Sequence, residues 1–228
     1  MTVQHINRYL DHAILKPELS RQEAIEAIQL GIDYKVRTAC VRPCDIELAA
    51  EMCKGTETEV SCVLAFPHGC TTSLVKADEA RRYIEAGTQE IDMVVNFGFV
   101  RSAMWDEVVA DIGAVTGVAK PAGVLVKVIF ETAYLTLDEI KRTVVCAIDA
   151  GADFVKSSTG FAGEGATEEK VQAMLDAAQG RVQVKASGGI RDRARAEMFV
   201  KMGVMRIGNG YTSTKAICEG VGQSTANY

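Results

Sequence analysis

The feature that most constrains the fold is a unit that recurs along the chain. Each unit is an amphipathic helical stretch, then a glycine, then a short run of apolar and β-branched residues. It occurs around Gly31, Gly87, Gly151 and Gly203. Glycine suits the left-handed residue that closes a helix, and the apolar run suits a strand covered on both faces. The unit therefore predicts helices that alternate with buried parallel strands.

Further runs raise the number of candidate strands to eight. They are LDHAIL near the start, VSCVLAF, VLVKVIF and VQVKA. Helix starts are also marked, because Ser20 with Glu23 and Thr136 with Glu139 have the spacing of capping boxes. A closed barrel and an open doubly wound sheet both fit such alternation. The strand count and the lack of a GxGxxG or GxxxxGK[ST] motif favour one α/β domain over residues 1–228, a (β/α)8 TIM barrel.

Composition and the chain ends narrow the classes of protein. The net charge of −5 gives no basic field for nucleic acid, and no apolar run is long enough to span a membrane or serve as a signal peptide. The seven cysteines form no CxxC pair, so we expect reduced thiols and no metal site. These features predict a cytoplasmic protein, and a homodimer is the expectation from base rates. Residues 219–228 are polar and glycine-rich, which predicts a mobile tail.

Three lysines lie inside apolar strand runs, where lysine is uncommon because burying an ammonium group is costly. They are Lys127, Lys156 and Lys185. Residues two apart in a strand share one face of the sheet, and intervening residues such as Val126 and Val128 are better candidates to pack on helices. The three lysines are therefore predicted to point into the barrel.

The same alternation in QEIDMVV places Glu90 and Asp92 inside the barrel and Ile91 and Met93 outside. These charged residues lie late in their strands, at the end where barrel active sites are assembled. One interpretation is a satisfied ion-pair network without a catalytic role. We favour a catalytic site, because an excess of cations in a confined volume serves chemistry better than stability.

Such a site suits chemistry at a carbonyl group. A lysine beside a second ammonium in an apolar cavity has a lowered pKa, so a useful fraction is the free amine that attacks a carbonyl. Imine and enamine intermediates follow, and they allow a carbon–carbon bond beside the carbonyl to form or break. Asp92 is the candidate acid/base group, acting through a bound water.

Glycine-rich turns follow three of the predicted strands. SSTGFAGEGAT comes after Lys156, SGGI comes after Lys185, and IGNG ends the last strand. Consecutive backbone amides that lead into a helix N-terminus bind anions, and barrels commonly hold phosphate after the seventh and eighth strands. The predicted substrate-binding residues in these turns are Gly160, Gly188, Gly189, Gly208, Asn209 and Gly210.

With these motifs in place, almost the whole chain resembles the deoxyribose-phosphate aldolase family. The matching segments are LDHAILKP, VLAFPHGCTTSLVKADEA, EIDMVVN, VLVKVIFET, GADFVKSSTGF, GATEE, VKASGGIR and RIG. Their order and spacing all agree with the family. The resemblance implies reversible cleavage of 2-deoxy-D-ribose 5-phosphate to D-glyceraldehyde 3-phosphate and acetaldehyde, with no metal or organic cofactor.

The resemblance also implies roles for individual residues. Lys156 would form the Schiff base, Lys185 would be the ammonium that tunes it, and Asp92 would relay protons. The supporting residues that it implies are Lys127 and Asp11 in the polar network, Cys40 near the substrate, and Tyr228, which would reach back to assist protonation of the enamine.

Some positions depart from the family pattern. Asn209, Gly210 and Tyr211 stand where the phosphate loop of the family usually has a small residue followed by serines. Ala13 replaces a threonine, and Arg42 replaces an asparagine. An imine-forming lyase with a different or non-phosphorylated acceptor aldehyde is therefore an alternative. Two further alternatives are a sugar-phosphate isomerase that uses carboxylate chemistry and a barrel that serves as a non-catalytic scaffold.

Overall fold

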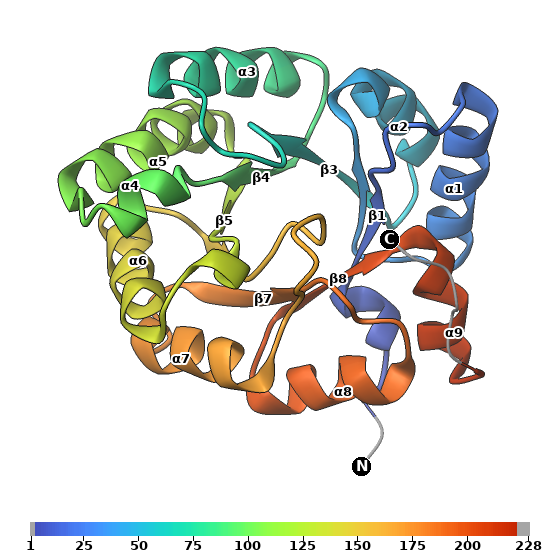
Figure 1. The fold of residues 1–228 in the computed structure, drawn as a ribbon. Coiled ribbons are helices and arrows are strands. Elements are labelled where there is room, and N and C mark those ends of the chain that lie inside the picture. Colours follow the sequence, from blue (N-terminus) through green and yellow to red (C-terminus); the bar gives the residue numbers. More distant parts are fainter. Residues whose placement is uncertain (1–2, 223–228) are drawn as a thin grey trace.

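A closed barrel of parallel strands forms the centre of the computed structural model, which describes residues 3–222 (Figure 1). The eight strands pair in sequence order, and β1 closes the barrel against β8. The strands are β1 Leu10–Ile14, β2 Thr38–Val41, β3 Glu59–Leu64, β4 Glu90–Val94, β5 Leu125–Ile129, β6 Phe154–Lys156, β7 Gln183–Ser187 and β8 Arg206–Gly210. The predicted single-domain (β/α)8 barrel is confirmed.

Helices surround the barrel as an outer ring (Figure 1). They are α1 Arg21–Asp33, α2 Ile46–Cys53, α3 Ser73–Glu85, α4 Phe97–Arg101, α5 Trp105–Ala119, α6 Leu137–Asp149, α7 Glu168–Ala178, α8 Arg193–Met202 and α9 Thr214–Glu219. Short 3-10 helices cover Ile6–Tyr9, Pro43–Asp45, Lys120–Ala122, Thr132–Tyr134 and Tyr211–Ser213. Both predicted capping boxes are present, so α1 begins after Ser20 and α6 begins after Thr136.

The glycine of the repeated unit has the predicted role at three of its four positions. Gly87, Gly151 and Gly203 have positive φ angles at the ends of helices. The prediction is wrong for Gly31, which lies within α1. A Cβ atom at this position would lie 3.2 Å from Cδ2 of His12, so this glycine allows a strand side chain to approach the helix closely.

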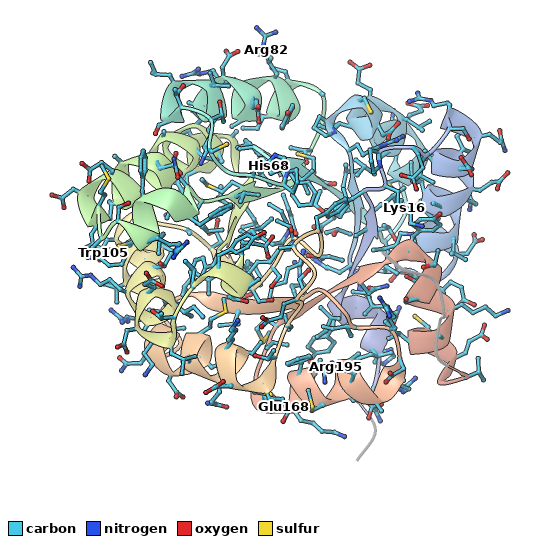
Figure 2. The ribbon with its side chains drawn as sticks, in the orientation of Figure 1. Lys16, His68, Arg82, Trp105, Glu168 and Arg195 are labelled. Carbon is cyan, nitrogen blue, oxygen red and sulfur yellow. The ribbon has the colours of Figure 1, made fainter. Side chains whose placement is uncertain are left out.

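In β4 and β5 the charged side chains point inward, and the apolar side chains between them point outward. Ile91, Met93, Val126 and Val128 are buried in the layer between barrel and helices, as their alternation predicts. The opposite faces of these strands line the interior, which is filled with side chains (Figure 2). Strand parity therefore determines which charged residues meet at the centre.

Helix α9 reaches into the segment that we predicted as a tail. Glu219 is its last residue, and the carboxylate of Glu219 accepts a hydrogen bond from the Tyr34 hydroxyl at 2.5 Å. Tyr228 lies outside the described residues. Among residues 3–222, no helix is both long enough and apolar enough to cross a bilayer. All seven cysteines lie in this part of the chain and are free thiols.

Candidate active site

A buried cluster of charged side chains occupies the barrel interior. Six strands contribute to it, and each member is less than a tenth exposed. The members are Asp11 on β1, Glu90 and Asp92 on β4, Lys127 on β5, Lys156 on β6, Lys185 on β7 and Arg206 on β8. The predicted inward direction of the three lysines and two β4 carboxylates is confirmed.

Asp92 joins the three lysines. Its Oδ1 atom accepts a hydrogen bond from Lys127 Nζ at 2.7 Å. Its Oδ2 atom accepts from Lys156 Nζ at 2.8 Å and from Lys185 Nζ at 2.7 Å. Burial alone would raise the pKa of Asp92, but these cations hold it well below its usual range. Asp92 is therefore a carboxylate, and its Oδ2 atom lies between the amines of Lys156 and Lys185.

Arg206 closes the cluster at the amino-terminal end of the barrel. Its guanidinium donates to both carboxylate oxygens of Glu90, at 2.8 and 2.9 Å, and to Asp11 at 2.8 Å. Asp11 also accepts from Lys185 at 2.5 Å, so the arginine is connected to the lysines through one carboxylate. Arg206 is not among the residues predicted from the sequence. Alternation from Gly208 would have placed it inside the barrel.

Lys156 is the cation in this cluster with the fewest carboxylate partners. Lys127 pairs with Asp92, Glu90 and Asp11, and Lys185 pairs with Asp92 and Asp11, whereas Lys156 pairs with Asp92 alone. Burial would lower the pKa of all three lysines, but the carboxylates raise the pKa of Lys127 and Lys185 above the usual value.

Burial and the charge of Lys185 lower the pKa of Lys156, although Asp92 opposes them. The cluster holds four cations, three lysines and Arg206, against three carboxylates, so loss of one proton from Lys156 balances its charge. Lys156 is therefore the group best suited to act as a free amine.

The loops after β5 and β6 are joined around Lys156. Phe130 N–H donates to the carbonyl of Lys156, and Thr132 N–H donates to that of Ser157. Between them, Glu131 is buried in a left-handed conformation with φ 55°, and its carboxylate accepts hydrogen bonds from the amide and hydroxyl of Thr159. Burial raises the pKa of Glu131. These contacts fix the chain that follows the candidate amine.

The predicted glycines separate into two groups. Gly189, Gly208 and Gly210 line a small pocket between the loops after β7 and β8, together with Thr212 and Ser213. This is the place where barrels commonly hold phosphate. The hydroxyl groups of Thr212 and Ser213 are present at the pocket although Gly210 carries none.

Gly160 and Gly188 lie instead where the β6 and β7 loops meet. A Cβ atom on Gly188 would lie 2.8 Å from the Cα of Gly165 and 3.6 Å from that of Gly160. The carbonyl of Gly188 accepts a hydrogen bond from Ala166 N–H at 3.1 Å. The structure gives these two glycines a packing function, since a side chain at Gly188 would separate the two loops.

Asn209 directs its side chain away from this pocket. Its Nδ2 atom donates to Thr214 Oγ1 at 2.8 Å, and the same hydroxyl contacts Nδ1 of the buried His12 at 2.7 Å. The other ring nitrogen of His12 contacts the carbonyl of Ala27 at 2.8 Å. A substrate contact from Asn209 would therefore come from its backbone amide. This group of polar residues was not predicted from the sequence.

Ser187 is a further residue that sequence reasoning missed. It shares the inward face of β7 with Lys185, and its hydroxyl lies 2.4 Å from where a Cβ atom on Gly208 would lie. Within residues 3–222, this hydroxyl and Asn209 Oδ1 are the buried side-chain oxygens that have no hydrogen-bond partner. An unpartnered buried hydroxyl beside Lys185 is placed to contact a polar ligand.

An apolar wall faces the lysines across the barrel. Ala13, Leu15, Cys40 and Val63 form a separate buried cluster against Phe66. Burial and the nearby charge of Asp92 raise the pKa of the Cys40 thiol, while the lysines oppose this change. The candidate site thus has one charged side and one apolar side.

The chain thus folds as a closed (β/α)8 barrel whose interior holds a buried lysine beside a carboxylate, an arrangement that suits imine chemistry. Residues 21–220 match the model of the DeoC/LacD family aldolases. The chain belongs to this family.

Named relatives agree with this assignment. The chain is 41% identical over 208 residues to a deoxyribose-phosphate aldolase of Natranaerobius thermophilus. This alignment covers 91% of this chain and 94% of the relative. It is 40% identical over 220 residues to a deoxyribose-phosphate aldolase of Clostridium perfringens, and this alignment covers 96% of this chain and 97% of the relative.

Solved structures agree with the fold. The aldolase QR15 superposes with a TM-score of 0.90 at 38% identity over 96% of each chain. A tetrameric deoxyribose phosphate aldolase from Aeropyrum pernix superposes with a TM-score of 0.86 at 28% identity, over 94% of this chain and 89% of that chain.

Proposed function

We propose that this protein is a class I aldolase that reversibly cleaves 2-deoxy-D-ribose 5-phosphate to D-glyceraldehyde 3-phosphate and acetaldehyde. The observation that carries the proposal is the position of Lys156 in the charged cluster. It is buried, its pKa is lowered by burial and by Lys185, and one carboxylate holds it. Family membership and the names of the relatives support the same reaction.

The reaction begins when the free amine of Lys156 attacks the aldehyde carbon of the open-chain sugar phosphate. Loss of water gives an iminium ion, which withdraws electrons from the neighbouring bond between C2 and C3. The C3 hydroxyl loses its proton, this bond breaks, and C3 leaves as the aldehyde carbon of glyceraldehyde 3-phosphate. The remaining enamine takes a proton at C2, and water then releases acetaldehyde and the amine.

Neighbouring residues support these steps. Lys185 keeps Lys156 deprotonated, and Asp92 relays protons through a bound water, because its Oδ2 atom lies between the two amines. Asp11 and Lys127 complete the network. Cys40 borders the acetaldehyde carbons, and we infer that Tyr228 assists protonation of the enamine.

The phosphate group is assigned to the pocket between the β7 and β8 loops. The backbone amides around Gly189, Gly208, Asn209 and Gly210 are the proposed donors, with Thr212 and Ser213 supplying hydroxyl groups. Gly160 and Gly188 shape the neighbouring loops. Ser187 is the proposed partner of a substrate hydroxyl. The mechanism requires no metal or organic cofactor.

Borohydride reduction in the presence of acetaldehyde tests the proposal. Peptide mass spectrometry should locate a reduced acetaldehyde adduct on Lys156. The Lys156→Met variant should give no adduct, whereas Lys141→Met, which changes an exposed lysine of α6, should behave like the parent. Failure to trap any adduct with the folded parent protein would contradict the imine mechanism and favour carboxylate-based isomerisation.

Two further measurements address the substrate and the assembly. Cleavage of 2-deoxyribose 5-phosphate should be much faster than that of 2-deoxyribose, while equal rates would favour a non-phosphorylated acceptor. We also propose a cytoplasmic homodimer, which light scattering of the purified protein tests directly.

A further inference from the structure

The two buried oxygens without a hydrogen-bond partner among residues 3–222 face opposite sides of the barrel wall. Asn209 Oδ1 lies on the helix side of β8, where the amide group of the same side chain donates to Thr214. Ser187 Oγ lies on the interior side of β7, the face that also carries Lys185. Of the two oxygens, the serine hydroxyl is therefore the one that adjoins the space for a substrate.

The neighbouring strand leaves room for this hydroxyl. Ser187 is the register partner of Gly208 in β7 and β8, which lie side by side (Figure 1). A Cβ atom on Gly208 would lie 2.4 Å from Ser187 Oγ and 2.9 Å from Ser187 Cβ. Any other residue at position 208 would therefore displace the serine side chain, and glycine keeps the hydroxyl inside the barrel.

The fold holds Ser187 through its backbone and not through its hydroxyl. Ser157 Oγ donates to the Ser187 carbonyl at 3.0 Å and accepts from the Ser187 amide at 3.0 Å. Both hydrogen bonds would persist with alanine at position 187. Because burying a hydroxyl without a protein partner does not stabilise a fold, its presence beside the amines indicates a role in binding.

Ser187 lies between the amines and the phosphate pocket. It follows Lys185 by two residues, and it precedes Gly189, which lines the pocket, by two residues. Gly208, its neighbour on β8, lines the same pocket. With C1 of the sugar phosphate on Lys156 and the C5 phosphate in the pocket, the hydroxyl groups between these two points are those on C3 and C4.

The chemistry of the reaction distinguishes these two hydroxyl groups. The C3 hydroxyl loses its proton when the bond between C2 and C3 breaks, so it needs a proton acceptor, which the relay through Asp92 supplies. The C4 hydroxyl does not react, and its carbon is bonded to the C5 atom that carries the phosphate. It therefore needs a neutral hydrogen-bond partner at the pocket end of the site, which is where Ser187 lies.

We propose that Ser187 Oγ forms a hydrogen bond with the C4 hydroxyl of the sugar phosphate, which is the C2 hydroxyl of D-glyceraldehyde 3-phosphate. The inference rests on the proposed aldolase function and makes Ser187 a determinant of acceptor specificity. A ligand that lacks this hydroxyl leaves the buried serine hydroxyl unpaired, and a site built in this way discriminates against such a ligand. The disfavoured acceptor is 3-oxopropyl phosphate, which differs from D-glyceraldehyde 3-phosphate by this one hydroxyl.

The test compares these two acceptors in the synthetic direction, with acetaldehyde as the donor and with the full-length parent and Ser187→Ala. The parent should show the higher kcat/KM with D-glyceraldehyde 3-phosphate. The ratio of the two kcat/KM values should fall at least about fivefold in Ser187→Ala, because the hydrogen bond to the hydroxylated acceptor is lost. An unchanged ratio in the folded variant would overturn the inference.

Two controls separate recognition of the acceptor from a structural role. Ser213→Ala removes a hydroxyl from the phosphate pocket, so it should weaken both phosphorylated acceptors alike and keep the ratio of the parent. Without substrate, Ser187→Ala should unfold at or above the melting temperature of the parent, because it removes no hydrogen bond of the protein. A large fall in its melting temperature, or an equal fall of the acceptor ratio in both variants, would count against the inference.

Failure of this inference and failure of the proposed function give different results. Borohydride trapping of acetaldehyde on Lys156 of the parent requires no acceptor. Trapping by the parent, together with an acceptor ratio that Ser187→Ala does not change, would refute the role of Ser187 and leave the imine mechanism intact. No trapping by the folded parent would overturn both.

Discussion

Replacing Lys185 with methionine should raise the pKa of Lys156 and slow imine formation near neutral pH. The amines of Lys185 and Lys156 both donate to Asp92 Oδ2, at 2.7 and 2.8 Å, so the two nitrogens lie within about 5.5 Å of each other. At this distance two positive charges repel by about 3 kcal/mol at an effective dielectric constant of about 20. Without this repulsion, the fraction of Lys156 that is a free amine falls roughly a hundredfold at pH values below the pKa of Lys156. Asp11 retains Arg206 and Lys127 as partners, so the variant should fold.

The assay is the rate of acetaldehyde trapping by borohydride at a series of pH values. The rate should rise with pH as Lys156 loses its proton, and this rise should move to higher pH in Lys185→Met. The two proteins should converge at high pH, where both amines are free. Lys185→Arg keeps the positive charge and should retain the profile of the parent. Superimposable profiles for Lys185→Met and the parent would refute the electrostatic role of Lys185.

Three further predictions concern other parts of the barrel. Burial lowers the pKa of His12 from 6.5 to about 4, so between these pH values a proton binds the unfolded chain but not the folded one. The free energy of unfolding therefore falls by about 3 kcal/mol as the pH falls through this window. Denaturant unfolding should show this loss in the parent and not in His12→Gln. Arg206→Met should destabilise the fold by about 3–5 kcal/mol because it leaves Glu90 with Lys127 as its one partner. The double variant that adds Glu90→Gln should recover part of this loss, and equal stability of the single and double variants would argue against the pairing. Gly208→Ala should slow acetaldehyde trapping at least about tenfold, because its Cβ would lie 2.4 Å from Ser187 Oγ and 3.2 Å from Lys185 Cε, and Ser187→Gly in the same chain should restore the rate.

Alternation of residues along the strands is sufficient to predict the charged side of the site. It places Lys127, Lys156 and Asp92 inside because each strand also carries apolar residues at the intervening positions, and these must face the helices. The same rule applies to Asn209. It lies two residues after the outward-facing Ile207 in β8, so its side chain also points outward. Its assignment to the substrate came from its place in a glycine-rich turn, and the strand parity takes precedence.

Contacts between distant residues could not be predicted in this way. Gly31 is close to His12, and Gly188 is close to Gly165, but nothing in the sequence around either glycine indicates its partner. An apolar cavity lined by Leu15, Pro43, Phe66 and Phe161 is a similar case, since these residues come from the segments after β1, β2, β3 and β6, which meet only in the folded barrel.

The ion pairs of Arg206 bear on how the chain folds during synthesis. This arginine belongs to the last strand, whereas Asp11 belongs to the first, and the two are 195 residues apart. A nascent chain that ends before β8 would expose Glu90 and Asp11 without this partner, so the barrel cannot complete its interior until nearly the entire chain has left the ribosome. Truncation before residue 206 should therefore yield a chain that depends on chaperones, even though most of the helices are already present.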